Sequence, residues 1–259
     1  MIEIKNKDCI EYMNELKEKS IDLVITSPPY NMGRSGKGSD LNIQYDDNRY
    51  WKDYNDWIVN IFKCFDMVVK DDGIVCWNIA MNTSSINGLQ SFLFYQSRIV
   101  EETGFILCDV LVWEKSTGLF SSKSVATRRK CEFVYIWCKK DYFKMHRIKQ
   151  NMGNKKENID NIIKDETKSL KCKYNGAVFT QYLVNRLIYI YGVYDNNKLS
   201  TDMNVLDPFS GSGTVASVCK KLNCNFYGSE LDKNCYEFSL DRLKGFESTE
   251  VEYVVGGLF

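Results

Sequence analysis

The placement of proline constrains the fold of this chain more than any other feature of its sequence. Only three prolines occur in 259 residues, and each closely follows an apolar run that predicts a buried strand. Pro28 and Pro29 follow the run Ile21–Thr26, and Pro208 follows the run Asn204–Asp207. Because proline cannot donate to a sheet ladder, both strands must end here. Ligands of open α/β sheets bind beyond the carboxyl ends of strands, so the sequence predicts a binding site at these two ends.

The first strand end continues as Ser27-Pro28-Pro29-Tyr30. The Ser27 hydroxyl and the carbonyls around the prolines can accept hydrogen bonds, and Tyr30 adds a flat ring. Together they predict a rigid cup for a planar group that carries an amine. From these four residues alone, an ordinary strand-ending turn with a packed tyrosine remains an equal alternative.

The second strand end continues into a Gly-x-Gly loop, residues 210–213, which precedes a helix predicted over 214–222. Glycines let the backbone approach a ligand closely, and the amides at a helix start favour an anionic group. Glu230 stands 17 residues after Gly213, where an acidic residue at a strand end hydrogen-bonds ribose hydroxyls. A nicotinamide dinucleotide site is the alternative. Its third glycine would be Ala216 here, which some such sites tolerate, but no dehydrogenase catalyst is apparent.

Together the two motifs resemble those of the amino-group DNA methyltransferases that use S-adenosylmethionine. Ser27-Pro28-Pro29-Tyr30 is similar to their catalytic motif, and residues 207–213 are similar to their cofactor loop. The catalytic motif comes first along this chain, which matches the permuted motif order of the β group. The resemblance implies an α/β, Rossmann-like fold with a mixed, mostly parallel sheet flanked by helices and a small target-recognition insertion.

The resemblance also implies roles for individual residues, with S-adenosylmethionine as the cofactor. Catalysis falls to Ser27, Pro28, Pro29 and Tyr30. Asp8 matches an acidic residue that meets the adenine end of the cofactor, and capping the next helix is an alternative role that is compatible with it. The implied cofactor contacts are Asp8, Cys9, Phe179, Asp207, Pro208, Phe209, Ser210, Gly211, Gly213, Thr214 and Glu230.

Charge is unevenly distributed along the chain. Residues 121–175 hold 15 Lys and Arg against 6 Asp and Glu, a net charge of +9, and the remainder carries −9. A basic segment on an acidic body is typical of a polyanion binder, although a solvated loop is the alternative. The charge asymmetry favours nucleic acid as partner. The resemblance implies double-stranded DNA, a catalytic domain over 1–139 and 176–259, and a target-recognition insertion over 140–175. The predicted DNA contacts are Arg34, Lys37, Lys123, Arg128, Arg129, Lys130 and Arg147.

Several other classes of protein are disfavoured by composition. The ten cysteines include no C-x-x-C pair and there is one histidine, His146, so no metal site is expected. No proline precedes a cysteine, which argues against the covalent chemistry of carbon-5 cytosine methylation. No apolar run reaches a membrane-spanning length and the N-terminus lacks a secretory pattern, so we expect a cytoplasmic protein.

The target base is the least constrained prediction. A serine at position 27 resembles the cytosine-N4 enzymes more than the adenine-N6 enzymes, whereas Tyr45-Asp46-Asp47 resembles a segment that also occurs in adenine enzymes. Cytosine N4 is favoured, and adenine N6 is the alternative. An RNA methyltransferase and a catalytically inactive DNA-binding protein are more distant alternatives. A homodimer, and a cognate restriction endonuclease acting on the same site, remain open as further partners.

Periodicity predicts the remaining elements. Asn78 and Asn82 lie at the carboxyl end of the strand expected over 74–79, where they could line the site or cap the next helix. Strands 105–114 and 131–139 are expected as an antiparallel pair at one edge, with Cys131 and Cys138 in core positions. The other strands are expected over 74–79 and 225–228. One further helix is expected to include Trp57 and to end at about residue 69. The remaining helices are expected over 10–19, 89–102, 178–191 and 233–244.

Overall fold

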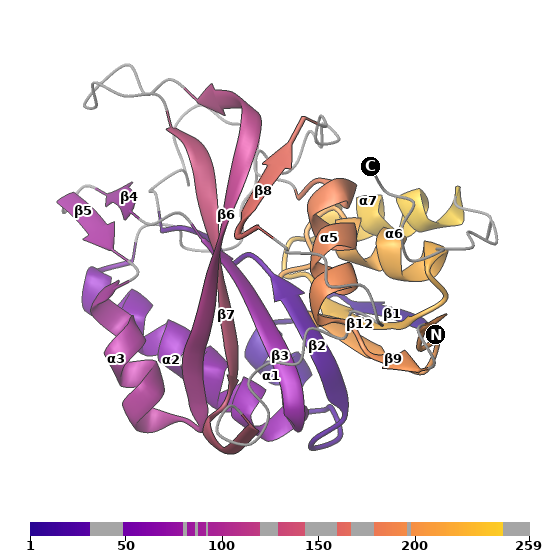
Figure 1. Cartoon of the computed structure of the whole chain (residues 1–259), viewed down its shortest axis with the longest axis horizontal. Coiled ribbons are helices and arrows are strands. Elements are labelled where there is room, and N and C mark those ends of the chain that lie inside the picture. The colour runs from indigo at the N-terminus through magenta and orange to yellow at the C-terminus, as the bar shows by residue number, and fades with distance from the viewer. Residues whose placement is uncertain are drawn as a thin grey trace.

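The structure, a computed structural model, describes residues 1–31, 49–79, 82–85, 88–91, 93–119, 129–142, 160–166, 179–195 and 198–245. Its centre is an eight-stranded sheet flanked by helices (Figure 1). The strands lie in the order β1 (Ile2–Lys5), β12 (Asn225–Ser229), β11 (Asn204–Asp207), β2 (Ile21–Thr26), β3 (Val69–Ile79), β7 (Arg129–Lys139), β6 (Phe105–Leu119) and β8 (Ile162–Asp165). The helices are α1 (Cys9–Met13), α2 (Trp51–Val68), α3 (Leu93–Glu102), α5 (Gln181–Tyr191), α6 (Thr214–Lys221) and α7 (Lys233–Lys244). Two small antiparallel ribbons join β4 (Asn82–Ser85) to β5 (Gly88–Ser91) and β9 (Tyr194–Asp195) to β10 (Lys198–Leu199).

One strand of the sheet runs against the others. The five strands β1, β12, β11, β2 and β3 pair in parallel with one another in that order, and β6 pairs in parallel with β8. Strand β7 pairs antiparallel with both β3 and β6. This arrangement confirms the predicted mixed, mostly parallel sheet and the predicted antiparallel pairing of β6 with β7. It also brings the first residues of β7 to the edge at which the neighbouring strands end.

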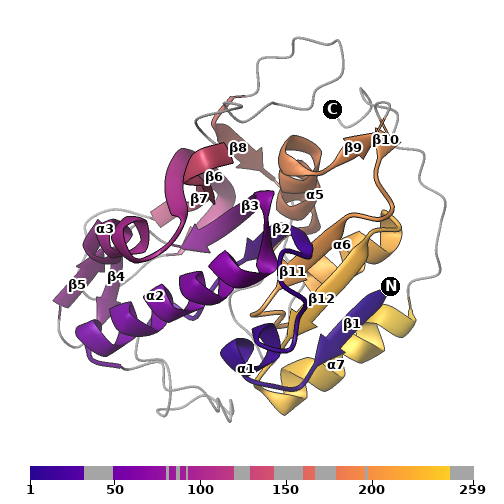
Figure 2. The same ribbon diagram turned by 90° about the horizontal axis from the view of Figure 1, so that it is seen from below.

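Two apolar cores lie on the two faces of the sheet. Leu23 and Ile25 of β2 pack with residues of α5, α6 and α7, whereas Val24 packs with residues of α1, α2 and α3. The alternation follows from the two-residue period of a strand. Figure 2 shows α2 running along one of these faces. Because helices cover both faces, the strand ends are the part of the sheet that is left for a ligand.

Three helices are at least three residues shorter than predicted. The helix expected over 178–191 starts at Gln181, because Thr180 is its N-cap. The helix expected over 10–19 ends at Met13, because the chain must turn back into β2 and does so through Lys19 at a positive φ of 48°. The helix expected over 89–102 starts at Leu93, since the preceding residues form β5.

The polar segment 140–175 contributes a strand that the sequence did not predict. Strand β8 pairs with β6, so the β6–β7 pair is not at the edge of the sheet. Its four residues alternate between exposed and buried, a pattern too short to detect in polar surroundings. Cys131 is exposed, which contradicts its predicted core position, whereas Cys138 is buried as expected.

Candidate active site

The ends of β2 and β11 lie side by side. The two strands pair in parallel, with Leu23 opposite Val205, so both chain segments leave the sheet at the same edge. At this edge Thr26 Oγ1 donates a hydrogen bond of 2.7 Å to Asp207 Oδ1, and both side chains are buried. The two sequence motifs therefore meet in space, as their placement after apolar runs predicts.

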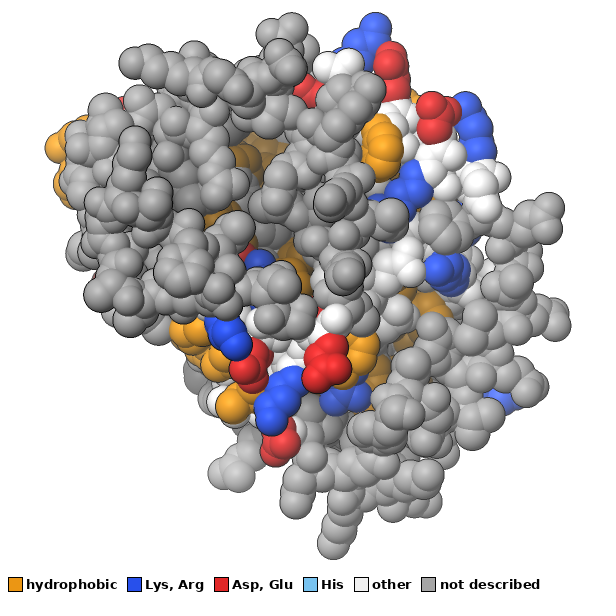
Figure 3. All heavy atoms as spheres, turned by 90° about the horizontal axis from the view of Figure 1, so that it is seen from above, with side chains coloured by type: hydrophobic (Ala, Val, Ile, Leu, Met, Phe, Trp, Pro, Cys, Tyr) orange, Lys and Arg blue, Asp and Glu red, His pale blue; other side chains and the backbone are white. Residues whose placement is uncertain are grey.

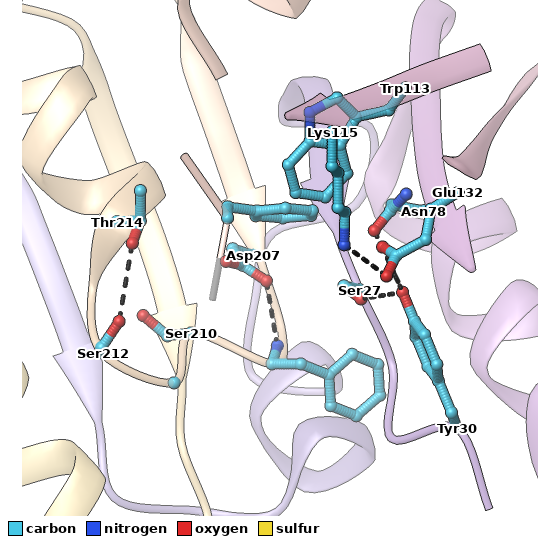
Figure 4. Close-up of a pocket in the computed structure, with 13 residues that line it drawn as sticks. Ser27, Tyr30, Asn78, Trp113, Lys115, Glu132, Asp207, Ser210, Ser212 and Thr214 are labelled. Carbon is cyan, nitrogen blue, oxygen red and sulfur yellow. Dashed lines mark hydrogen bonds and ion pairs between the residues drawn. The ribbon is translucent and has the colours of Figure 1, made fainter. Parts of the chain in front are cut away.

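One pocket receives side chains from both motifs and from β3, β6 and β7 (Figure 4). Tyr30, Lys115 and Glu132 lie on one side of it, and Ser210, Ser212 and Thr214 lie on the other. The lining residues are Ser27, Tyr30, Asn78, Trp113, Lys115, Glu132, Phe179, Asp207, Phe209, Ser210, Gly211, Ser212 and Thr214.

The proline turn is fixed on both sides. Tyr54 of α2 donates a hydrogen bond of 2.8 Å to the Pro29 carbonyl. The Tyr30 hydroxyl is 3.2 Å from Ser27 Oγ, 3.1 Å from Asn78 Oδ1 and 3.1 Å from Glu132 Oε2. Burial raises the pKa of Tyr30 well above its usual value, and the nearby Glu132 carboxylate adds to the shift. Tyr30 is therefore a protonated phenol that can donate a hydrogen bond.

The residue after Tyr30 holds together the two ends of the segment that follows it. Asn31 is buried and has a positive φ of 55°, a conformation that asparagine tolerates better than most residues. Its side chain accepts from the Arg49 amide at 2.7 Å and donates to the Arg49 carbonyl at 2.9 Å. The turn at Tyr30 is thereby tied to the residues that precede α2.

The conformation of the glycine loop is fixed by its glycines and by Glu230. Gly213 caps α6 with a φ of +73°, and a Cβ there would lie 2.9 Å from the Cβ of Ser239, so only glycine fits. The Gly211 amide donates to Glu230 Oε2 at 2.7 Å. Ser210 Oγ is buried at the pocket and has no hydrogen-bond partner among the described residues. Because an unpaired buried hydroxyl is costly, the loop fits a ligand that brings a polar group to Ser210.

Two carboxyl groups support this loop. Asp207 Oδ1 accepts from the Phe209 amide at 3.1 Å as well as from Thr26. Burial raises the pKa of Asp207 to about 7, and these two hydrogen bonds oppose the shift. Burial also raises the pKa of Glu230, whose oxygens accept from the amides of Gly211 and Asp232.

Phe179 and Trp113 close another side of the pocket, with ring centroids 6.4 Å apart. Trp113 Nε1 donates to Asp165 Oδ2 at 2.9 Å, and the Thr180 hydroxyl donates to the same oxygen. Thr180 also caps α5 by accepting from the Leu183 amide at 3.1 Å. Asp165, which belongs to the unpredicted strand β8, therefore holds together two elements that line the pocket.

Comparison with known proteins identifies the family. A family model described as DNA methylase, covering enzymes that methylate N6 or N4 amines, matches residues 21–241. The chain belongs to this DNA methylase family. Its activity is therefore methylation of an exocyclic amine in DNA, with S-adenosylmethionine as methyl donor, as the resemblance implied.

Two curated relatives align over almost the whole methylase. The type II methyltransferase M.BglII from Bacillus subtilis is 28% identical over 260 residues, covering 93% of this chain and 69% of the relative. The type II methyltransferase M.HpaI from Haemophilus parainfluenzae is 24% identical over 258 residues, covering 94% of this chain and 76% of the relative.

Solved structures share the fold. The PvuII DNA methyltransferase, described as cytosine-N4-specific, has a TM-score of 0.69 and 18% identity, covering 96% of this chain and 88% of that chain. The M1.HpyAVI–SAM complex has a TM-score of 0.62 and 22% identity, covering 94% of this chain and 100% of that chain.

Most of the predicted cofactor residues lie at the pocket of the methylase, and some do not. Phe179, Asp207, Phe209, Ser210, Gly211 and Thr214 line it. Asp8 instead caps α1, accepting from the Ile10 amide at 2.8 Å, which confirms its alternative role. Cys9 is buried in the core beside α2, and burial raises the pKa of its thiol. The implied cofactor contacts of Asp8, Cys9, Pro208, Gly213 and Glu230 remain predictions.

The predicted DNA contacts fall mainly outside the described residues. This holds for Arg34, Lys37, Lys123, Arg128, Arg147 and the side chain of Arg129. Lys130, at the start of β7, is exposed. On the face in Figure 3, the described Lys and Arg side chains stand among Asp and Glu side chains, without a continuous positive area among the described residues. The basic DNA-contact surface therefore remains a prediction.

Four polar residues of the pocket were missed or left undecided from the sequence. Ser212 was not among the predicted contacts, although it lies within the cofactor loop motif. Lys115 and Glu132 were not identified, and Asn78 was assigned either to the site or to a helix cap. Asn78 lines the pocket, so the first of its two roles is confirmed. Glu132 had a detectable signal, since it is the one carboxylate of β7 and directly precedes the apolar run 133–138.

Proposed function

We propose that this methylase transfers the methyl group of S-adenosylmethionine to the N4 amine of a cytosine turned out of double-stranded DNA. The observation that carries the proposal is the shared pocket, in which Ser27 and Tyr30 face the glycine loop. The donor is thereby assigned to the loop after β11 and the target base to the turn after β2.

The chemistry asked of the turn is orientation. The lone pair of an exocyclic amine is conjugated with its ring and is a poor nucleophile. Hydrogen bonds from the amine to Ser27 Oγ and the Pro28 carbonyl would hold the lone pair toward the donor and stabilise the positive charge that develops on nitrogen. Tyr30 would stack on the base. This stacking would help to offset the free energy of unpairing the base from the duplex, which is roughly a few kcal/mol. No covalent enzyme intermediate is needed.

The cofactor supplies an activated methyl group, and the loop supplies its binding. Ser210 offers an unpaired hydroxyl, and the backbone amides at the start of α6 favour a carboxylate. Phe179 and Phe209 add aromatic surface at the same pocket. Glu230 keeps its place as a ribose contact in this proposal, since each of its oxygens retains a free lone pair beside the backbone amide that it accepts from.

The choice of cytosine rests on Ser27, where a hydroxyl stands in place of a carboxylate. The cytosine-N4-specific PvuII enzyme shares the fold, which is compatible with this choice. Adenine N6 is the second candidate because Ser27 can accept from either amine. The test is to expose unmethylated genomic DNA to the enzyme, digest it to nucleosides and separate them by mass spectrometry. N4-methylcytosine is the expected product, and N6-methyladenine alone would contradict the proposal.

Double-stranded DNA is the proposed substrate, and a cognate restriction endonuclease is a proposed partner, as the type II names of the relatives suggest. Competition between duplex DNA and RNA as methyl acceptors tests the first. Protection of methylated DNA from an endonuclease of the same site tests the second.

Homodimer formation is a further proposal, tested by light scattering. None of the described helices is long and apolar enough to cross a membrane.

A further inference from the structure

Four polar side chains form a continuous hydrogen-bonded row along one wall of the pocket (Figure 4). Lys115 Nζ donates to Glu132 Oε1, and Glu132 Oε2 is 3.1 Å from the Tyr30 hydroxyl. The Tyr30 hydroxyl is in turn 3.2 Å from Ser27 Oγ. The reversed direction of β7 makes this row possible, because it places Glu132 at the edge where β2 and β6 end.

The chemistry of each group fixes the direction of each hydrogen bond. An ammonium group only donates and a carboxylate only accepts, so the Lys115–Glu132 pair leaves Glu132 as an acceptor for Tyr30. Asn78 acts in the same direction. Its amide nitrogen donates to the Phe133 carbonyl at 3.1 Å, which turns its oxygen toward the Tyr30 hydroxyl.

Tyr30 has one hydroxyl proton, and two acceptors compete for it on the side away from Ser27. The phenol oxygen is therefore left to accept, and Ser27 must donate its proton to Tyr30. With its proton engaged there, Ser27 Oγ presents only lone pairs to the pocket. An acceptor is what an amine with two N–H donors requires.

We propose that Glu132, held by Lys115, is a positioning residue that acts through Tyr30 to keep Ser27 a pure hydrogen-bond acceptor toward the target amine. This inference rests on the proposed function, in which Ser27 accepts from that amine. It assigns a task to Tyr30 in addition to stacking.

A structural role for the ion pair is the competing explanation. Glu132 lies opposite Trp113 in the β6–β7 ladder, so Lys115 and Glu132 could merely hold these two strands together. An ion pair whose side chains are 31% and 20% exposed contributes modestly to stability. In that case its loss would affect unfolding, and its effect on rate would be independent of Tyr30.

The test is a double-mutant cycle with Tyr30→Phe and Glu132→Gln, read as the single-turnover rate of methyl transfer to unmethylated genomic DNA. In the glutamine variant Lys115 retains the amide oxygen, which turns an N–H donor toward Tyr30. This N–H competes with Ser27 for the Tyr30 oxygen, whereas Tyr30→Phe removes that oxygen, so each variant disturbs the acceptor of the Ser27 proton. We expect each to lower the rate about 10-fold, and the double variant to be no more than about twofold slower than the slower single variant.

The cycle has controls for folding and for charge. Binding of S-adenosylmethionine, measured by calorimetry, should be unchanged in all three variants, and Glu102→Gln removes an ion-paired carboxylate on the distant helix α3. A double variant about 100-fold slower than wild type would overturn the inference, because the two residues would then act independently. A Glu132→Gln rate within about twofold of wild type would overturn it as well. The proposal that the target is cytosine N4 can be refuted independently of this inference, because the cycle measures the rate of methyl transfer whichever amine is methylated.

Discussion

Thr26 Oγ1 and Asp207 Oδ1 lie 2.7 Å apart although they are 181 residues apart in the chain. Their hydrogen bond joins Thr26, the last residue of β2 and the residue before the first motif, to Asp207, the last residue of β11 and the first residue of the second motif. The turn assigned to the target base and the loop assigned to the methyl donor thus share one buried anchor. Rigid positioning of this kind is what proximity catalysis requires.

The raised pKa of Asp207 predicts a specific dependence of stability on pH. Burial moves this pKa from 3.8 to about 7, so between these values the folded protein holds a proton that the unfolded chain has lost. The free energy of unfolding should therefore fall as pH rises from about 4 to about 7, by up to about 4 kcal/mol from this group.

Urea unfolding of wild type and Asp207→Asn at pH 4.5 and pH 7.5 measures this dependence. The asparagine variant lacks the titration, so its stability relative to wild type should rise between the two pH values. Asp202→Asn, which removes an exposed carboxylate before the same strand, is the matched control. An equal wild-type-to-variant difference at both pH values would contradict the prediction.

Replacing Ser27 by alanine should reduce turnover far more than cofactor affinity. The hydroxyl lies on the Tyr30 side of the pocket, whereas the cofactor is assigned to the glycine loop. Loss of one hydrogen bond to a developing charge typically costs about 100-fold in rate. Steady-state kinetics and calorimetry with S-adenosylmethionine separate the two effects. Ser200→Ala is the control, because Ser200 precedes β11 and lies at the end of the sheet opposite the pocket. Equal losses of rate and affinity in the Ser27 variant would refute the assigned role.

The part of the site that the two motifs form could be predicted, because the residues of each motif lie close together in the sequence. Residues such as Ser27, Tyr30 and Gly211, which line the pocket, stand within a few residues of the strand ends that place them, so identifying the strands was sufficient. The same reasoning predicted the antiparallel pairing of β6 with β7 and the helix α7, which are long elements. Short elements such as β8 carry too few residues for a pattern to stand out.

The other half of the pocket depends on strand order, which local sequence does not encode. Lys115 is near the end of β6 and Glu132 near the start of β7, and they meet Tyr30 only because β7 runs against its neighbours next to β3. Asp165 is similar, because its partners Trp113 and Thr180 come from other elements.

Replacing Glu230 by alanine should weaken binding of S-adenosylmethionine by about 10-fold or more. Glu230 ties the Gly211 amide at 2.7 Å and the Asp232 amide at 2.8 Å, so its loss frees the loop that the cofactor is expected to meet. Each lost hydrogen bond to a charged acceptor is worth about 1.5–3 kcal/mol. Calorimetry gives the affinity directly. Glu237→Ala on α7 is the control, and unchanged affinity in the Glu230 variant would refute the role.

Replacing Asp165 by alanine should reduce both stability and cofactor affinity. Asp165 is 3% exposed and accepts from Trp113 Nε1 and the Thr180 hydroxyl, so its removal leaves two donors without this acceptor. We expect a loss of about 1–3 kcal/mol in the free energy of unfolding for each donor left unsatisfied. Affinity should fall as well, since Trp113 itself lines the pocket and Thr180 follows the lining residue Phe179.

Chemical denaturation and calorimetry on Asp165→Ala, Asp165→Asn and Lys164→Ala test this link. The asparagine variant keeps one acceptor oxygen and should lose less stability than the alanine variant. Lys164 is exposed on the same strand, so its alanine variant reports the effect of altering β8 without touching the buried contacts. If Asp165→Ala is as stable as Lys164→Ala and binds S-adenosylmethionine equally well, the segment 160–166 does not support the pocket. Loss of affinity in the Asp165 variants alone would instead establish that the basic segment and the cofactor site are coupled through one carboxylate.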